Sequence, residues 1–156
     1  MSYRLAFDLI QRFEGCRLTS YPDPGTGGMP YTVGWGSTYI DGKPVKPNQT
    51  ITQVKADQAL LGEVARIAQV LALKVPGWSR LNVNQQCALI SFSFNLGANW
   101  YGSPGFSTIT RTIKEGRLKD VPAALLLYRN PGTNVEAGLR RRRIAEGVLW
   151  AAPVKP

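Results

Sequence analysis

The longest regular pattern in the sequence is an apolar stripe with helical spacing that starts near Thr52 and ends before Pro76. Its members recur at i, i+4, i+7 and i+11, on one face of a helix; they are Leu60, Val64, Ile67 and Leu71. Because proline cannot continue a helix interior, the helix is expected to end at Val75. Gly62 is the interior position at which it could break. The rest of the chain must be arranged before and after this helix.

The segment before this helix has no helical periodicity. Gly, Pro and turn-forming residues crowd positions 19–47, and two runs of β-type composition, Tyr31–Trp35 and Ser37–Ile40, flank Gly36. A small antiparallel hairpin or a three-stranded sheet is therefore expected, with Asp41-Gly42 as a turn.

Helical patterns occupy both ends of the chain. Ser2 is a suitable N-cap for an amphipathic helix that runs to about Phe13. After the long helix, further helices are expected at 84–96, 108–115, 118–128 and 134–150. These elements predict an α+β architecture in a single domain over residues 1–156. The long helix would join a small sheet-bearing lobe, roughly 13–60, to a mainly helical lobe, roughly 76–156 plus the N-terminal helix.

The absence of histidine excludes several kinds of chemistry. Without it, no Ser-His-Asp or Cys-His triad and no histidine-bearing zinc site can form. Two cysteines are too few for a structural zinc site, so Cys16 and Cys87 are expected as buried free thiols. We expect neither a metal nor a cofactor. No apolar run approaches the roughly 18 residues of a membrane span, and we expect no signal peptide, signal anchor or stable membrane insertion.

The balance of charge points to a polyanionic partner. The 19 Lys+Arg against 10 Asp+Glu give a formal charge of +9. A basic nucleic-acid-binding domain would carry such a charge. Its arginines, however, should interleave with aromatic residues on one face or form a known reading motif, and the sequence has neither pattern.

Without histidine, the ten carboxyl groups are the candidates for acid–base chemistry. Several are interpreted as solvated helix faces or caps; these are Asp57, Glu63, Glu115 and Asp120. Glu14 ends an amphipathic helix beside Phe13, where the helix dipole and partial desolvation disfavour the charged form, as a general acid requires. Asp23 lies in a turn-forming loop where solvent keeps it ionised. Two carboxyls in unlike environments are typical of glycoside hydrolysis.

Motifs around these two carboxyls support that interpretation. They run Phe13-Glu14-Gly15, Leu18, Tyr21, Asp23 and then Tyr31-Thr32-Val33-Gly34-Trp35-Gly36. Three more follow in order: 84–97, 105–108, and Gly138-Leu139 with Arg142-Arg143 and Glu146. Over nearly the whole chain, these motifs resemble the phage-type lysozymes, the endolysins of the T4 lysozyme family (glycoside hydrolase family 24).

The resemblance implies a lysozyme-like fold and roles for particular residues. Glu14 would be the general acid, Asp23 would assist the attack of water, and Thr32 would hold that water on the opposite face of the sugar, so that the product is inverted. The substrate would be the glycan strands of peptidoglycan, cut between N-acetylmuramic acid and N-acetylglucosamine. The residues along the glycan-binding cleft would be Gly36, Phe94 and Asn95.

Two positions depart from the family pattern. The interval from Asp23 to Thr32 holds eight residues where the common pattern has about five, so Thr26 competes with Thr32 for the catalytic role. Thr32 is favoured because the run Val33-Gly34-Trp35-Gly36 follows it directly. Many relatives have His where this chain has Ser37, and a hydrogen bond between Ser37 and Glu63 is expected to replace a His-Asp pair.

The densest charge in the chain is the run Arg140–Arg143. Successive helical residues lie about 100° apart, so these four arginines cannot all face one way. Our hypothesis is that Arg142 or Arg143 reaches the first helix and pairs with Asp8 or Glu14.

The resemblance also implies a biological setting and leaves alternatives. A phage endolysin that lyses its host would be a monomer with no nucleic-acid partner, held in the host cytoplasm until a separate holin releases it to the periplasm and cell wall. A lytic transglycosylase acts on the same polymer with one carboxyl and no water nucleophile, so Asp23 and Thr32 argue against it. A basic, non-catalytic nucleic-acid- or wall-binding domain would not need Glu14 and Asp23.

Overall fold

The computed structural model describes residues 2–156 and divides into two compact units. The sheet unit is Ile10–Glu63. The helical unit consists of Val64–Pro156 together with the residues up to Leu9. Two helices, α1 (Arg4–Phe13) and α2 (Gln53–Lys74), contribute residues to both units. No helix within residues 2–156 is long and apolar enough to cross a membrane.

The sheet unit contains two small antiparallel pairs of strands. Strand β1 (Arg17–Tyr21) pairs with β2 (Thr32–Gly34), and β3 (Tyr39–Ile40) pairs with β4 (Lys43–Pro44) through the expected Asp41-Gly42 turn. The predicted hairpin is thus confirmed at β3 and β4, whereas β1 was not predicted. Most of β1 is exposed, so its sequence lacks the apolar alternation that identifies a half-buried strand.

A small apolar core holds the sheet unit together. Its buried members come from β2, β3 and the segment after β4. Partly buried residues of the loop before β2, of the segment before α2 and of α2 itself pack around them. They are Val33, Ile40 and Val45, surrounded by Tyr31, Ile51 and Ala59. The core therefore anchors the middle of β2, one residue after Thr32.

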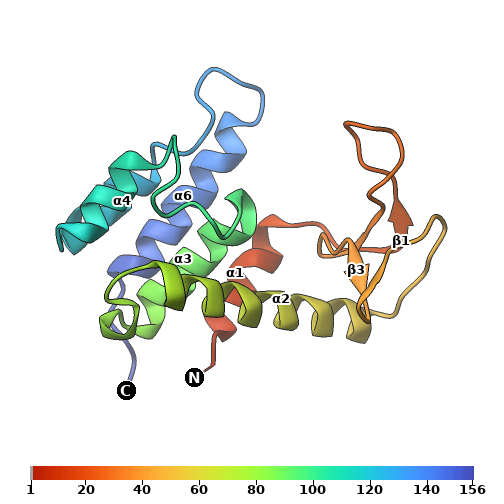
Figure 1. Ribbon diagram of the computed structural model, residues 1–156, viewed down its shortest axis with the longest axis horizontal. Helices are drawn as coiled ribbons and strands as arrows, with labels where there is room; N and C mark the ends of the chain where they lie inside the picture. The colour runs from red at the N-terminus through yellow and green to blue at the C-terminus, as the bar shows by residue number, and fades with distance from the viewer. Residues whose placement is uncertain (1) are drawn as a thin grey trace. The chain divides into compact units, whose positions relative to one another are not determined.

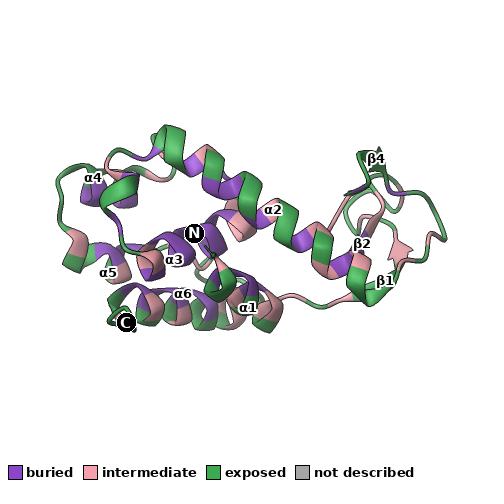
Figure 2. Cartoon of the chain, turned by 90° about the horizontal axis from the view of Figure 1, so that it is seen from below, coloured by how far each residue is buried: buried purple, intermediate pink, exposed green. Residues whose placement is uncertain are grey.

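The long helix α2 is continuous over 22 residues. The apolar stripe predicted from the sequence is buried along it, and Figure 2 shows buried and exposed residues alternating around the helix. The helix does not break at Gly62, where an added Cβ would meet nothing within 4 Å. Because the helix supplies its own backbone hydrogen bonds, a single interior glycine lowers its stability without ending it.

The helical unit is built around α3 (Val83–Leu96), which begins with a capping box between Asn82 and Gln85. Most of α3 is buried, and it packs along α6 (Glu136–Ala151), as Figure 1 shows. Aromatic rings of α3 and the segments after it pack edge to face around Phe92.

Shorter helical elements complete this unit, and one differs from its prediction. They are η1 (Trp78–Arg80), α4 (Ser107–Lys114), η2 (Leu118–Asp120) and α5 (Val121–Leu125). The single helix expected at 118–128 is a 3-10 turn followed by five helical residues. Pro122 explains the division, because proline is tolerated in the first turn of a helix but not in its interior.

Candidate active site

Glu14 follows directly after the last residue of α1. Its backbone N–H donates to the carbonyl of Ile10 (2.9 Å), so it continues the hydrogen-bond pattern of the helix. Its side chain is partly buried. The helix therefore fixes where the carboxyl leaves the backbone, as the sequence predicted from the end of the amphipathic pattern.

Asp23 closes the loop that follows β1 with its own side chain. Asp23 Oδ1 accepts hydrogen bonds from the backbone N–H of Gly25 (2.8 Å) and of Thr26 (3.0 Å). Backbone bonds join Asp23 to Gly27 and Gly28 as well. A Cβ at Gly25 would lie 3.1 Å from Asp23 Oδ1, so this turn favours glycine there. In the described chain no group bonds to Oδ2, which leaves that oxygen for another acceptor role.

The two candidate threonines have different surroundings. Thr26 Oγ1 donates to the carbonyl of Met29 (2.7 Å) and accepts from the backbone N–H of Gly28 (3.2 Å), so its hydroxyl is engaged within the loop. Thr32 lies on β2, opposite Tyr21 of β1, and is partly buried. This register places Asp23 two residues beyond the strand partner of Thr32.

A tight loop follows Thr32. Backbone hydrogen bonds run in both directions between Val33 and Ser37 (2.9 Å each). Gly34 and Gly36 adopt positive φ angles of 66° and 106°, which favour glycine. Gly36 is exposed, whereas a Cβ at Gly34 would lie only 3.2 Å from the Cβ of Ala56 on α2.

Asp57 of α2 binds this loop, a role that the sequence analysis missed. Trp35 Nε1 donates to Asp57 Oδ1 (2.7 Å), as does Gln53 Nε2 (2.9 Å), and Gln11 Nε2 lies 3.5 Å from the same oxygen. The interpretation of Asp57 as a solvated helix face is therefore wrong. One signal pointed to it: a partly buried indole N–H needs an acceptor.

The expected hydrogen bond between Ser37 and Glu63 is not formed. The hydrogen bonds of Ser37 in the described structure are the backbone pair with Val33. The α2 carboxylate that contacts the loop is instead Asp57, which follows Ala56, the residue that Gly34 approaches closely.

The cysteines differ in part from expectation: both are free thiols, but only Cys87 is buried, and burial raises its pKa.

The remaining candidate residues, Phe94 and Asn95, lie near the end of α3 and are partly buried. They belong to the helical unit, whereas Glu14, Asp23, Thr32 and Gly36 belong to the sheet unit. Asn95 Oδ1 accepts a hydrogen bond from Arg143 Nη2 (2.9 Å), which turns its Nδ2 donor away from that arginine.

Arg143 belongs to a buried ionic network in the helical unit. Arg143 Nε lies 2.8 Å from Glu146 Oε2, and Arg142 Nε lies 3.3 Å from Glu146 Oε1. Ser91 Oγ also donates to Glu146 Oε1 (2.8 Å). Arg143 and Glu146 have 0% exposed side chains, and this burial raises the pKa of the Glu146 carboxyl while the two guanidinium groups oppose the shift.

This network settles part of the arginine hypothesis. Two of the four consecutive arginines face inward, as the helical spacing required, and Arg140 and Arg141 are exposed. Asp8 pairs with neither inward arginine: its ion pair is with Arg4 of its own helix (2.8 Å). A pair between Arg142 or Arg143 and Glu14 stays a prediction.

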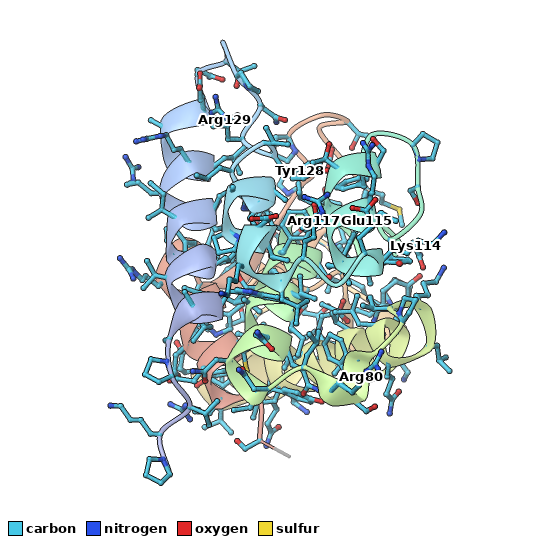
Figure 3. The ribbon with its side chains drawn as sticks, turned by 90° about the vertical axis from the view of Figure 1, so that its left-hand side faces the viewer. Arg80, Lys114, Glu115, Arg117, Tyr128 and Arg129 are labelled. Carbon is cyan, nitrogen blue, oxygen red and sulfur yellow. The ribbon has the colours of Figure 1, made fainter. Side chains whose placement is uncertain are left out.

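Exposed basic residues cover other parts of the helical unit. Figure 3 shows Arg80 and Lys114 at its periphery and Arg117 beside Glu115, with which it forms an ion pair (2.8 Å). Counted by unit, the sheet unit holds as many acidic as basic residues, so the whole formal charge of +9 belongs to the helical unit. Within residues 2–156 no group of three His, Cys, Asp or Glu side chains could hold a metal ion.

Solved structures with the same architecture define the class of fold. The endolysin from Escherichia coli O157:H7 phage FAHEc1 aligns over 100% of this chain and 97% of its own, with a TM-score of 0.77 and 29% sequence identity. The muramidase domain of SpmX from Asticaccaulis excentricus aligns over 96% and 97%, with a TM-score of 0.78 and 29% identity. The fold is α+β and lysozyme-like, as the sequence predicted.

Sequence comparison then identifies the family. Residues 11–146 match the Phage lysozyme family, and the chain belongs to it. The endolysin of Lactococcus phage c2 is 34% identical over 148 residues, which make up 94% of this chain and 58% of that protein. The endolysin of Lactococcus phage phivML3 matches to the same extent, so this chain spans 58% of the length of both curated relatives.

Proposed function

We propose that this chain is a single catalytic domain that hydrolyses the β-1,4 bond between N-acetylmuramic acid and N-acetylglucosamine in peptidoglycan. The observation that carries the proposal is the register of β1 and β2, which pairs Tyr21 with Thr32 in the same unit as Glu14. The family match covers Glu14, Asp23 and Thr32.

The chemistry assigns one step to each of these side chains. Glu14 protonates the glycosidic oxygen as the sugar leaves. Thr32 Oγ1 holds a water molecule on the opposite face, and the oxygen of this water bonds to the anomeric carbon as the glycosidic C–O bond breaks. Asp23 accepts the proton of the water through Oδ2, because Oδ1 is occupied by two backbone donors. This arrangement inverts the anomeric carbon and needs roughly 6.5–9.5 Å between the two carboxyls.

Replacing the proposed acid tests the assignment. Glu14→Gln should lower the rate at which purified sacculi release reducing ends by about 10²–10⁴-fold, because the amide cannot donate the proton. Glu115→Gln is the matched control, since Glu115 is exposed and pairs with Arg117 on the helical unit. Full activity in Glu14→Gln would contradict the proposal. Anhydromuramyl ends in place of reducing ends would identify a lytic transglycosylase.

The choice between the two threonines needs its own variants. Thr32→Val removes the hydroxyl at nearly constant shape and should lower kcat. Thr32→Ser keeps the hydroxyl and should retain most of the wild-type kcat. Thr26→Ser keeps the hydroxyl that closes the loop and should stay active. If Thr32→Val retained the wild-type kcat and Thr26→Val lost it, Thr26 would be the catalytic residue. The anomer that NMR detects first in the product reports inversion directly.

We further infer the setting in which the reaction occurs. The domain acts as a monomer on glycan strands during host cell lysis, with Gly36, Phe94 and Asn95 contacting the glycan. It stays in the host cytoplasm until a holin opens the way to the wall, and it needs no nucleic acid. The positive charge of the helical unit supports attraction to an anionic envelope, so raising the salt concentration should slow association with sacculi.

A further inference from the structure

Three side-chain donors from different segments converge on one oxygen of Asp57. Trp35 comes from the loop after β2, Gln53 from the first turn of α2 and Gln11 from α1. The bond from Trp35, at 2.7 Å, is the shortest, and that from Gln11, at 3.5 Å, lies at the limit for a hydrogen bond. All four residues belong to the sheet unit.

Two of these donors lie close in sequence to the proposed reacting groups. Trp35 is three residues after Thr32, and Gln11 is three residues before Glu14. The loop that carries Trp35 is closed by the backbone bonds between Val33 and Ser37, which tie it to the end of β2.

Backbone packing beside Asp57 brings this loop close to α2. Gly34 approaches Ala56 so closely that an added Cβ would lie 3.2 Å from the Cβ of Ala56. Figure 2 shows β2 beside the first turns of α2. The indole bond to Asp57 therefore fixes the orientation of a loop whose distance from α2 is already set by the contact at Gly34.

We propose that Asp57 is a positioning residue that holds the Thr32-bearing segment and the Glu14-bearing helix in the geometry required for catalysis. The inference rests on the proposed function and deepens it. Asp57 acts through Trp35 and Gln11 and does not exchange a proton with the substrate, because its Oδ1 serves as acceptor for the donors that join these segments.

Kinetics on purified sacculi test this role. Asp57→Ala should lower kcat about 10- to 100-fold with KM nearly unchanged, because displacement of a reacting group by about 1 Å has effects of that size. Asp57→Asn keeps an acceptor oxygen of similar size and should recover most of the rate. Asp8→Ala, which removes an exposed helical aspartate paired with Arg4, is the matched control and should behave as wild type.

A double-mutant cycle separates positioning from general loss of stability. Trp35→Phe keeps the ring packing and removes only the N–H, so it should lower kcat in the wild type. In the Asp57→Ala background it should add less than about a twofold change, because the bond that it removes is already gone. Rates are taken per folded molecule, with the folded fraction measured by urea unfolding of each variant.

The pH profile and NMR give two further readouts. The limbs of the kcat/KM profile should keep their positions in Asp57→Ala, because a residue that only positions others titrates no catalytic step. The protein has four tryptophans, and the indole N–H resonance of Trp35 is identified by its loss in Trp35→Phe. That resonance and the Thr32 amide should both shift in Asp57→Ala.

The outcomes distinguish this inference from the proposed function. An active wild type, an inactive Glu14→Gln and an Asp57→Ala with kcat within about twofold of wild type would overturn the inference alone. Independent, multiplying effects of Trp35→Phe and Asp57→Ala would overturn it as well, and loss of one pH limb would make Asp57 a proton-transfer group instead. A wild type that releases no glycan ends would remove the proposed function and this inference together.

Discussion

Replacing Glu146 with glutamine should strongly destabilise the protein. The carboxylate has 0% exposure and lies between two guanidinium groups, with Arg143 Nε at 2.8 Å from Oε2 and Arg142 Nε at 3.3 Å from Oε1. Glutamine has nearly the same size, so the change creates no cavity. In either orientation of the amide, however, its NH2 group faces an arginine donor, and two buried positive charges lose their counterion.

The magnitude follows from the burial of the partners. Removing one member of a buried ion pair lowers the free energy of unfolding by about 3–5 kcal/mol, because the remaining charges stay desolvated. For a chain of this length that corresponds to a fall in the midpoint of thermal unfolding on the order of 10 °C. Urea unfolding followed by tryptophan fluorescence, with thermal scans by circular dichroism, measures both quantities.

Two further variants make the result interpretable. Glu136→Gln lies on the same helix and removes a partly exposed pair with Arg129, so its effect should be small. The triple variant Arg142→Met, Arg143→Met, Glu146→Leu replaces the network with apolar groups and should lose less stability than Glu146→Gln alone. A Glu146→Gln protein within about 1 kcal/mol of wild type would refute the reasoning, because the two arginines would then not need their counterion.

Three other predictions concern single residues. Hydrogen bonds from Gly132 N–H and from Arg129 lower the pKa of Glu136 in the folded protein, so the unfolded chain binds a proton at this carboxyl more readily. The stability that Glu136 contributes above its unfolded pKa should therefore be lost as the pH falls through its folded pKa. Glu136→Gln should make the urea midpoint fall less steeply at acid pH. Gly34→Ala should lower the free energy of unfolding by about 1–2 kcal/mol, because its φ is +66° and Ala56 blocks the added methyl group, whereas Gly62→Ala in open helix surface should raise it by about 0.5–1 kcal/mol; equal urea midpoints would contradict this contrast. Gly25→Ala should lower kcat while changing the free energy of unfolding little, because the new methyl group displaces Asp23 Oδ1. An unchanged kcat on sacculi would show that the loop accommodates the methyl group without moving this oxygen.

Helical elements were predictable where their packing follows from local periodicity. The stripe of α2 and the boundaries of α3 follow from residues that are close in sequence and share one buried face. Strand β1 could not be predicted in the same way, because its first three residues are exposed and only pairing with β2 defines it. The helix expected at 118–128 is divided because Pro122 fits the first turn of a helix but not its interior.

Among the candidate site residues, too, those marked by local sequence pattern were predictable and those defined by long-range contacts were not. Glu14 and Asp23 stood out because few carboxyls occur and because local pattern places one at a helix end and the other in a turn. Asp57 did not, because its main partner, Trp35, is 22 residues away and meets it only in the folded protein. Helical spacing brings Glu146 within reach of Arg142 and Arg143, but its complete burial depends on packing against α3.

The loop at Asp23 has a consequence for how this chain can evolve. The carboxyl proposed to activate water is also the acceptor that folds its own loop, through the N–H groups of Gly25 and Thr26. Under the proposed mechanism, one residue therefore serves both the reaction and the folding of the loop. A lineage that exchanged Asp23 for a residue without an acceptor would lose the hydrogen bonds that fold the loop, whatever its effect on the proposed reaction. Substitutions that fold this loop in the same way are therefore those that keep an acceptor oxygen at this place.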